Sequence, residues 1–261
     1  KDVLYVFDIE QHKLIEQHGF DDLVSLFSPS WSPDNRRIVF SGLAFSGRCD
    51  LYLFDRDTKQ LLKLTNDAFD ERDPSFSPDG ESIAFSSDRG ASGQNGYYNL
   101  FVMNLRDGRI TYITQGGFSD QYPRWSPDGR FLAFLSDRSG TDNIWLTRAD
   151  SLGESFGYPL KQITQIVTGA MDPAWTGDGD LLYTAFDQFS FHLHLLEKPA
   201  ELYQVSPHLQ RDSLLAKNDS WTFARIGGDS KVKELKYKPK YSLDIAQSQI
   251  TQDPIFGTSG G

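Results

Sequence analysis

The sequence has very little cysteine and no long apolar run. Cys49 is the only cysteine among 261 residues, which rules out an internal disulfide and a thiolate metal cluster. It stands in a polar turn, and we expect an ordinary loop residue there rather than a reactive thiol. No apolar run reaches the roughly 18 residues that a membrane-spanning helix needs. No signal peptide is recognisable, but the chain starts at Lys1 in a strand-like run, so we expect a piece of a longer precursor.

Positive charge is also scarce. The chain has 26 Lys and Arg against 36 Asp and Glu, which gives a formal net charge of −10. Such a chain repels phosphate backbones, so we expect no nucleic-acid partner. Aromatic residues make up 13% of the chain, and they favour strands over helices.

The sequence repeats one hairpin pattern four times, at intervals of roughly 45–50 residues. Ser-Pro-Asp-Gly occurs at 77–80 and 126–129, Ser-Pro-Asp-Asn at 32–35, and Thr-Gly-Asp-Gly at 176–179. Proline presets the backbone at the second turn position, aspartate accepts backbone hydrogen bonds, and glycine supplies the positive φ that closes the turn. Each unit therefore predicts a tight hairpin between two short strands.

Four short strands per unit predict an all-β chain, a β-propeller of four-stranded antiparallel blades. About four and a half blades are present. We expect aromatic residues between neighbouring blades at Trp31, Phe76, Trp125 and Trp175, and each unit's leading proline at a strand start near the central channel. The predicted division is a half blade at 1–20, blades at 24–66, 67–116, 117–165 and 166–205, and a non-repeat extension or linker at 206–261.

These motifs resemble the TolB-type propeller repeat, a WD-like family of bacterial envelope proteins. The resemblance covers roughly residues 1–205 and rests on the hairpins at 74–80 and 123–129 and on Ser-Asp-Arg at 87–89 and 136–138. It implies a six-bladed ring around a channel, protein partners, and a periplasmic or outer-membrane location. The fourth unit departs from the pattern at Thr176 and Gly177, so we expect that blade to be distorted.

The C-terminal extension has its own resemblance. Residues 237–244 and 253–257 are similar to the lead-in to a bacterial outer-membrane barrel of the surface-antigen type, which implies a link to such a barrel. The apolar run 221–226 is expected to pack against the half blade, and the chain beyond Lys236 to be extended.

Residues just before each leading proline differ between units, and variation on a repeated scaffold is a place for binding specificity. We expect them at the mouth of the channel, where an acidic funnel would bind a cation or a basic peptide. The alternative is a hydrated channel with no ligand. The candidate binding residues are Glu71, Arg72, Asp73, Asp120, Gln121, Tyr122, Met171 and Asp172.

Signals for catalysis are weak. Residues 257–261 fit Gly-x-Ser-x-Gly, but no histidine follows them. His192 and His194 share one face of a strand and would be a start for a zinc site, although packing explains them better. The Ser-Asp-Arg repeats recur in register, which favours a structural role. We therefore expect no catalytic residues, no metal and no cofactor.

Two hypotheses follow. The first is a non-catalytic scaffold or protein-binding propeller segment of a larger bacterial cell-envelope protein, with a protein or peptide partner there. The alternative is the substrate-gating propeller of a peptidase whose catalytic domain lies outside this sequence.

Overall fold

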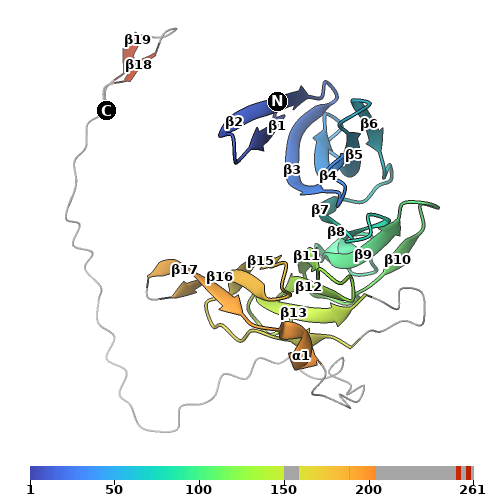
Figure 1. Cartoon of the computed structure of the whole chain (residues 1–261), viewed down its shortest axis with the longest axis vertical. Helices are drawn as coiled ribbons and strands as arrows, with labels where there is room; N and C mark the ends of the chain where they lie inside the picture. The colour runs from blue at the N-terminus through green and yellow to red at the C-terminus, as the bar shows by residue number, and fades with distance from the viewer. Residues whose placement is uncertain (150–158, 188, 204–250, 254–256, 260–261) are drawn as a thin grey trace, which may run out of the picture. The chain divides into compact units, whose positions relative to one another are not determined.

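The computed structural model describes residues 1–149, 159–187, 189–203, 251–253 and 257–259. It separates into two compact units, Lys1–Arg211 and Asp212–Gly261. The described part of the first unit is almost entirely antiparallel sheet, and Figure 1 shows its sheets in chain order from blue to orange. None of the described helices is both long and apolar enough to cross a bilayer.

The described residues of the first unit form five sheets. A two-stranded sheet comes first and consists of β1 (Val3–Asp8) and β2 (Lys13–Gly19). The next consists of β3 (Leu23–Trp31), β4 (Arg37–Ala44), β5 (Cys49–Asp55) and β6 (Gln60–Lys63). The third consists of β7 (Glu71–Phe76), β8 (Ser82–Ser87), β9 (Asn99–Asn104) and β10 (Ile110–Tyr112), with a 3₁₀ turn, η1 (Gly93–Asn95), before β9.

The fourth sheet consists of β11 (Asp120–Trp125), β12 (Phe131–Ser136), β13 (Asn143–Arg148) and β14 (Lys161–Gln162). The fifth consists of β15 (Ala170–Trp175), β16 (Leu181–Asp187) and β17 (Ser190–Leu196). The prediction of an all-β chain built from four-stranded antiparallel sheets is thus confirmed for three sheets.

The last repeat unit differs from the prediction of four whole blades, because its sheet has three strands among the described residues. After β17 the chain turns at Lys198, which has a φ of 44°, and forms the short helix α1 (Pro199–Tyr203). Tyr203 of this helix packs edge-on against Phe131, with ring centroids 5.4 Å apart. The described chain therefore leaves β17 as the outer edge of its sheet.

The repeated hairpins adopt the predicted turn. Gly80 and Gly129 have φ values of 70° and 71°, and Asn35 takes the same left-handed conformation at 56°. The Asp79 carboxylate accepts a hydrogen bond from the Glu81 amide at 2.9 Å. It also accepts one from the Ser77 hydroxyl at 2.5 Å. Each turn is therefore closed by its own side chains.

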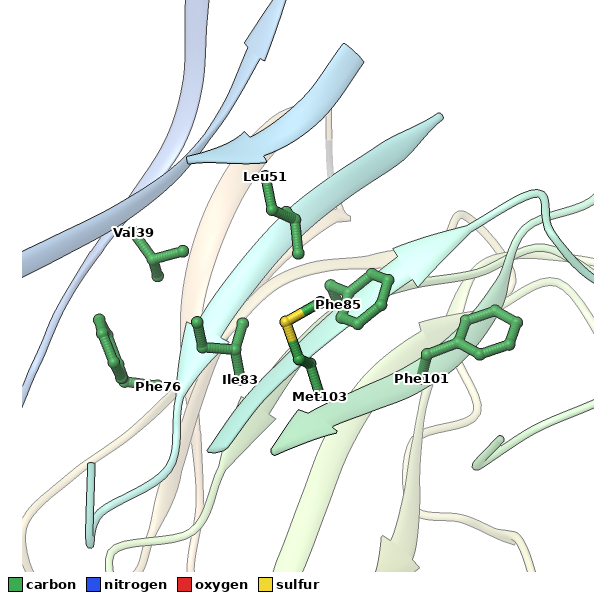
Figure 2. Close-up of a cluster of buried hydrophobic side chains, with 7 residues drawn as sticks. All are labelled: Val39, Leu51, Phe76, Ile83, Phe85, Phe101 and Met103. Atoms are coloured by element: carbon green, nitrogen blue, oxygen red, sulfur yellow. The ribbon is translucent and has the colours of Figure 1, made fainter. Parts of the chain in front are cut away.

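Apolar clusters join successive sheets into a common core. Figure 2 shows one such cluster, between the second sheet and the third. Burial of so much apolar surface between sheets is the main force that stacks them. The buried side chains of the cluster in Figure 2 come from β4, β5, β7, β8 and β9. They are Val39, Leu51, Phe76, Ile83, Phe85, Phe101 and Met103.

The aromatic residues expected between blades divide into two groups. The indole N–H of Trp125 donates to the carbonyl of Ser75 at 3.2 Å, and that of Trp175 donates to the carbonyl of Arg124 at 3.0 Å. Both bonds reach back to the preceding sheet at the equivalent position. Trp31 instead remains 44% exposed, because β1 and β2 are the only strands of the sheet before it.

The second unit is described over two short strands, β18 (Thr251–Asp253) and β19 (Gly257–Ser259), which pair antiparallel. Residues 257–259, which fit the first part of the Gly-x-Ser-x-Gly pattern, thus lie in a strand. The expectations for residues 221–226 and for the lysine-rich run near 236–240 lie outside the described residues.

Candidate functional site

In each of the four repeat units, the first strand contains a β-bulge at the leading proline of that unit. The pairing register shifts there in β3, β7, β11 and β15. These prolines therefore lie within strands at a bulge, and not at a strand start as predicted. A bulge accommodates proline because it removes the residue from the hydrogen-bonded ladder.

The residue before each of these prolines has a left-handed backbone. The φ values are 49° for Ser28, 52° for Asp73, 53° for Tyr122 and 53° for Asp172. Non-glycine residues rarely adopt this conformation, and such strain gathers at functional sites. One repeated backbone conformation thus presents four side chains of three kinds, a serine, a tyrosine and two aspartates.

Three of the bulges contribute to a pocket of about 360 Å³. The strained residues Ser28, Asp73 and Tyr122 lie in its wall, from the second, third and fourth sheets. The remaining lining residues are Phe27, Leu43, Cys49, Asp70, Arg72 and Gln121.

Asp73 is the central acid of this pocket. Its residue is only 7% exposed, and its carboxylate accepts a hydrogen bond from the Ser28 hydroxyl at 2.8 Å. Burial raises the pKa of Asp73, while the Ser28 bond and the charge of Arg124 act in the opposite direction. The charge of Asp73 in turn is the main reason that the pKa of Tyr122 is raised.

Two arginines lie near these acids. Burial lowers the pKa of Arg124, and the charge of Asp73 opposes that shift. Arg72 stacks over the ring of Tyr98, 4.7 Å from its centroid, and its guanidinium lies 3.6 Å from the Asp70 carboxylate. The wall of the pocket therefore combines partly neutralised charges with aromatic and apolar surface.

Cys49 lies at the start of strand β5, buried and lining the pocket, and not in the polar loop expected from its sequence neighbours. Burial, and next the charge of Asp70, raise the pKa of its thiol to about 12. A thiol with so high a pKa is protonated at neutral pH and is a poor nucleophile. Its contribution to the pocket is apolar surface.

Glu71 and Asp120 are fully buried, and each forms an ion pair with the arginine of a Ser-Asp-Arg repeat. Arg89 lies 2.5 Å from Glu71, and Arg138 lies 2.5 Å from Asp120. Glu71 also accepts a hydrogen bond from the Thr65 hydroxyl at 2.7 Å. These two candidates thus have partners within the fold, which gives the Ser-Asp-Arg repeats the structural role that was predicted.

The remaining predicted residues are distributed unevenly. Arg72, Asp73, Gln121 and Tyr122 line the pocket together. Met171 and Asp172 lie on β15 outside its lining, although the charge of Asp172 contributes to the raised pKa of Tyr122. Their role in binding stays a prediction.

The histidine pair is explained by local contacts. His192 is exposed and forms a hydrogen bond with the Ser190 hydroxyl at 2.8 Å. His194 stacks on Tyr183, with ring centroids 5.2 Å apart. The described residues contain no group of three or more His, Cys, Asp or Glu arranged to hold a metal.

Sequence reasoning missed five lining residues, among them Ser28, Cys49 and Asp70. Ser28 had a usable signal, because it precedes Pro29 just as Asp73 precedes Pro74. Cys49 had none, since its place in the pocket depends on where β5 begins.

Part of the chain is similar in sequence to a family of propeller domains. The family described as TolB beta propeller domain (PD40) matches residues 1–95. The Tol-Pal system protein TolB of Francisella tularensis subsp. mediasiatica (strain FSC147) is 38% identical over 78 residues, which are 30% of this chain and 17% of that protein. The match therefore spans less than a fifth of the curated relative's length.

Solved structures show the same fold. A putative TolB from Agrobacterium tumefaciens superimposes with a TM-score of 0.64 at 22% identity, over 76% of this chain and 70% of that one. A puromycin hydrolase superimposes with a TM-score of 0.53 at 16% identity, over 69% of this chain and 28% of that one. At such identities the likeness extends to the fold alone.

Proposed function

We propose that this chain, a repeat protein of the TolB (PD40) β-propeller type, is a non-catalytic protein-binding segment of a bacterial cell-envelope protein. Its pocket would take an extended, basic peptide segment of a partner. The observation that carries this proposal is the repeated left-handed bulge, which presents Ser28, Asp73 and Tyr122 in one pocket wall. The name of the relative, a Tol-Pal system protein, supports a protein partner in the envelope.

Charge favours a basic ligand. Asp70, Asp73 and Asp172 outnumber Arg72 and Arg124 in and around the pocket, and the whole chain carries a formal charge of −10. A cationic segment is attracted by this negative charge. A lysine or arginine beside Asp73 stabilises the charged form of its carboxylate, which burial disfavours.

The pocket also suits the backbone of a peptide. Its acceptors and donors lie beside the apolar surface of Phe27, Leu43 and Tyr122, the usual combination of a ligand site with a few placed polar groups. Among enzymes, the puromycin hydrolase shares only the fold, and this likeness gives the peptidase-gate alternative no added support.

Fluorescence anisotropy tests the proposal. We expect a labelled twelve-residue Gly-Ser peptide with three lysines to bind, and the same peptide with three glutamates not to bind. Asp73→Asn keeps the shape of the side chain and its left-handed backbone, and should weaken lysine-peptide binding about tenfold. The matched control Asp107→Asn removes one charge from the exposed turn between β9 and β10 and should leave binding unchanged. Equal binding of the two peptides, or equal loss in both variants, would contradict the proposal.

A further inference from the structure

The pocket wall contains one charge that the proposed function leaves without a role. Arg72 lines the pocket beside Asp73, and its side chain is 49% exposed. Its guanidinium lies over the ring of Tyr98, 4.7 Å from the centroid, and 3.6 Å from the Asp70 carboxylate, which is beyond hydrogen-bond distance. Among the described residues it donates no hydrogen bond. A guanidinium with unused donors is suited to a carboxylate, which it can bind through two parallel hydrogen bonds.

The arginines of the two Ser-Asp-Arg repeats show the contrast. Arg89 donates to the buried carboxylate of Glu71 at 2.5 Å, and Arg138 donates to that of Asp120 at 2.5 Å. Their side chains are only 12% and 13% exposed. Arg72 is bound to no such buried acid, so the stability of the sheets does not explain its presence in the pocket wall.

Arg72 also occupies a variable position of the repeat. It is the second residue before the leading proline of its unit, and the equivalent residues of the other units are Phe27, Gln121 and Met171. Arg72 alone is charged among these four. Variation at one position of a repeated scaffold is where binding specificity is found, so the charge of Arg72 is a candidate determinant of the ligand.

A longer loop in the same sheet supplies the ring beneath Arg72. The loop between β8 and β9 covers residues 88–98, whereas the loop between β12 and β13 covers only 137–142. The carbonyl of Tyr98, at the end of this longer loop, accepts hydrogen bonds from the Asp120 amide at 2.7 Å and from the Asn99 side chain at 3.2 Å. Insertions in single repeats often lie on the binding face. The anchored ring holds the guanidinium in place before a ligand arrives, which reduces the cost of ordering it.

The two neighbouring charges of the pocket wall suit a ligand that carries both signs. Asp73 is 7% exposed and Arg72 is half exposed, so the acid lies deeper than the arginine. They are successive residues in the wall of one pocket of about 360 Å³, so the ligand groups that contact them must lie close together.

The further inference rests on the proposed function and narrows its ligand. We propose that the pocket binds a peptide in which a lysine or arginine lies directly beside a carboxylate, with the cation at Asp73 and the carboxylate at Arg72. The carboxylate is that of a neighbouring acidic residue or of the chain terminus, since both present the same two oxygens to the guanidinium.

Fluorescence anisotropy of the full chain with three labelled peptides tests this inference. All three are twelve-residue Gly-Ser peptides with three lysines. The first is amidated and has no acid, the second is amidated and has one glutamate directly after its last lysine, and the third ends at its last lysine with a free carboxylate. The added carboxylate lowers the positive charge of the peptide, so attraction to the acidic chain as a whole predicts weaker binding. If Arg72 binds the carboxylate, the second or the third peptide should instead bind about tenfold more tightly than the first. The peptide that shows the gain identifies the source of the carboxylate.

Variants of the pocket wall assign the gain to Arg72. Arg72→Gln should abolish the gain and bind the first peptide at least as well as the wild type, because it removes a positive charge from the pocket. Arg72→Lys keeps the charge without the planar fork and should retain only part of the gain. Tyr98→Phe should keep the gain, and Tyr98→Leu should lose much of it.

Two further variants complete the test. Asp70→Asn removes the acid that competes for Arg72 but keeps an acceptor for the Cys49 amide, 3.4 Å away, and should enlarge the gain. Arg48→Gln is the matched control. It removes an exposed arginine that lies outside the pocket lining and donates to the Asp67 carbonyl at 3.2 Å, and it should leave the gain unchanged.

The outcomes separate this inference from the proposed function. A wild type that binds the first peptide, but binds neither carboxylate peptide more tightly, overturns the inference and leaves the proposed function standing. A wild type that binds none of the three contradicts both. A gain that survives Arg72→Gln, or that Arg48→Gln removes equally, overturns the assignment to Arg72. Binding of the first peptide by each variant shows that a lost gain is not lost folding.

Discussion

Strands β1 and β5 have nearly the same sequence over residues 4–8 and 51–55, yet their side chains differ sharply in burial. Phe54 of β5 is 2% exposed, whereas the equivalent Phe7 of β1 is 53% exposed. The difference lies in the neighbour: β1 covers the aromatic face of β5, and the described residues place no sheet over the matching face of β1. Burial in this array is therefore set by the adjacent sheet and not by the strand's own sequence.

The largest effect should come from truncating the covered member of this pair. Phe54→Ala removes a fully buried ring from the cluster around Val6 and Phe40, and should lower the free energy of unfolding by about 3–5 kcal/mol. Phe7→Ala should cost less than about 1 kcal/mol in dilute monomeric protein, because its ring is already half in water. Urea unfolding of both variants measures the difference. Equal losses in the two variants would mean that the aromatic face of β1 is covered in solution, which would contradict the difference between β1 and β5.

The second effect concerns the ion pairs that Arg89 and Arg138 form with the fully buried carboxylates of Glu71 and Asp120, in the third and fourth sheets. Arg89→Ala leaves the Glu71 carboxylate buried without its 2.5 Å partner, and should destabilise by about 2–4 kcal/mol, since Arg89 itself is slightly exposed. The fifth sheet has Ala170 where these sheets have Glu71 and Asp120. That sheet therefore forms without the pair.

Arg36→Ala serves as the control for this pair, because Arg36 contacts Asp55 at the surface, 2.9 Å away and half exposed. Its stability should stay close to that of the wild type, because solvent screens an exposed ion pair. The double variant Glu71→Leu/Arg89→Met should recover much of the loss, since a buried pair can be replaced by apolar packing. A single Arg89→Ala variant as stable as the wild type would show that Glu71 finds another partner.

The strand order could be predicted from sequence because its signals are local. Each Ser-Pro-Asp-Gly turn contains its own proline, hydrogen-bond acceptor and positive-φ residue, and Gly80 and Gly129 adopt the predicted conformation. The number of strands in the last sheet could not be predicted from the sequence, because the pairing of a fourth strand with β17 depends on long-range contacts. The departure at Thr176 and Gly177 indicated a distorted unit, but it lies in a different hairpin.

The candidate site was only half visible in the sequence. The variable residues before each proline could be identified from the sequence. The sequence did not show that Glu71 and Asp120 form ion pairs, or that Asp73 and Tyr122 line a pocket. A residue before proline usually adopts an extended backbone, so the left-handed bulge runs against local preference. The packing of the first strands of neighbouring sheets determines this backbone conformation, and the sequence of a single repeat does not contain that information.

A polar contact also ties the two-stranded sheet to the second sheet. The Glu16 carboxylate on β2 forms an ion pair with Arg56, lies 3.3 Å from the Lys59 ammonium and is 2.8 Å from the His18 ring nitrogen. Arg56 also lies over the ring of Trp31, 5.0 Å from its centroid. The polar edge of this interface thus complements the aromatic cluster around Phe54.

The smallest effect should come from Glu16, and it should depend on pH. The Arg56 hydrogen bond is the main cause that lowers the pKa of Glu16 from 4.5 to about 2. A lowered carboxyl pKa stabilises the fold above pH 4.5, and this stability is lost as pH falls from 4.5 toward 2. The full shift corresponds to about 3 kcal/mol, but the pair is partly exposed, so Glu16→Gln should cost about 1–2 kcal/mol at pH 7. Urea unfolding at pH 7, 4 and 2.5 should show the gap to the wild type closing with acid. Glu10→Gln, in the exposed β1–β2 turn, should stay within about 0.5 kcal/mol of the wild type. A Glu16→Gln gap that is the same at all three pH values would mean that the ion pair does not join these sheets, and that the apolar cluster alone holds them together.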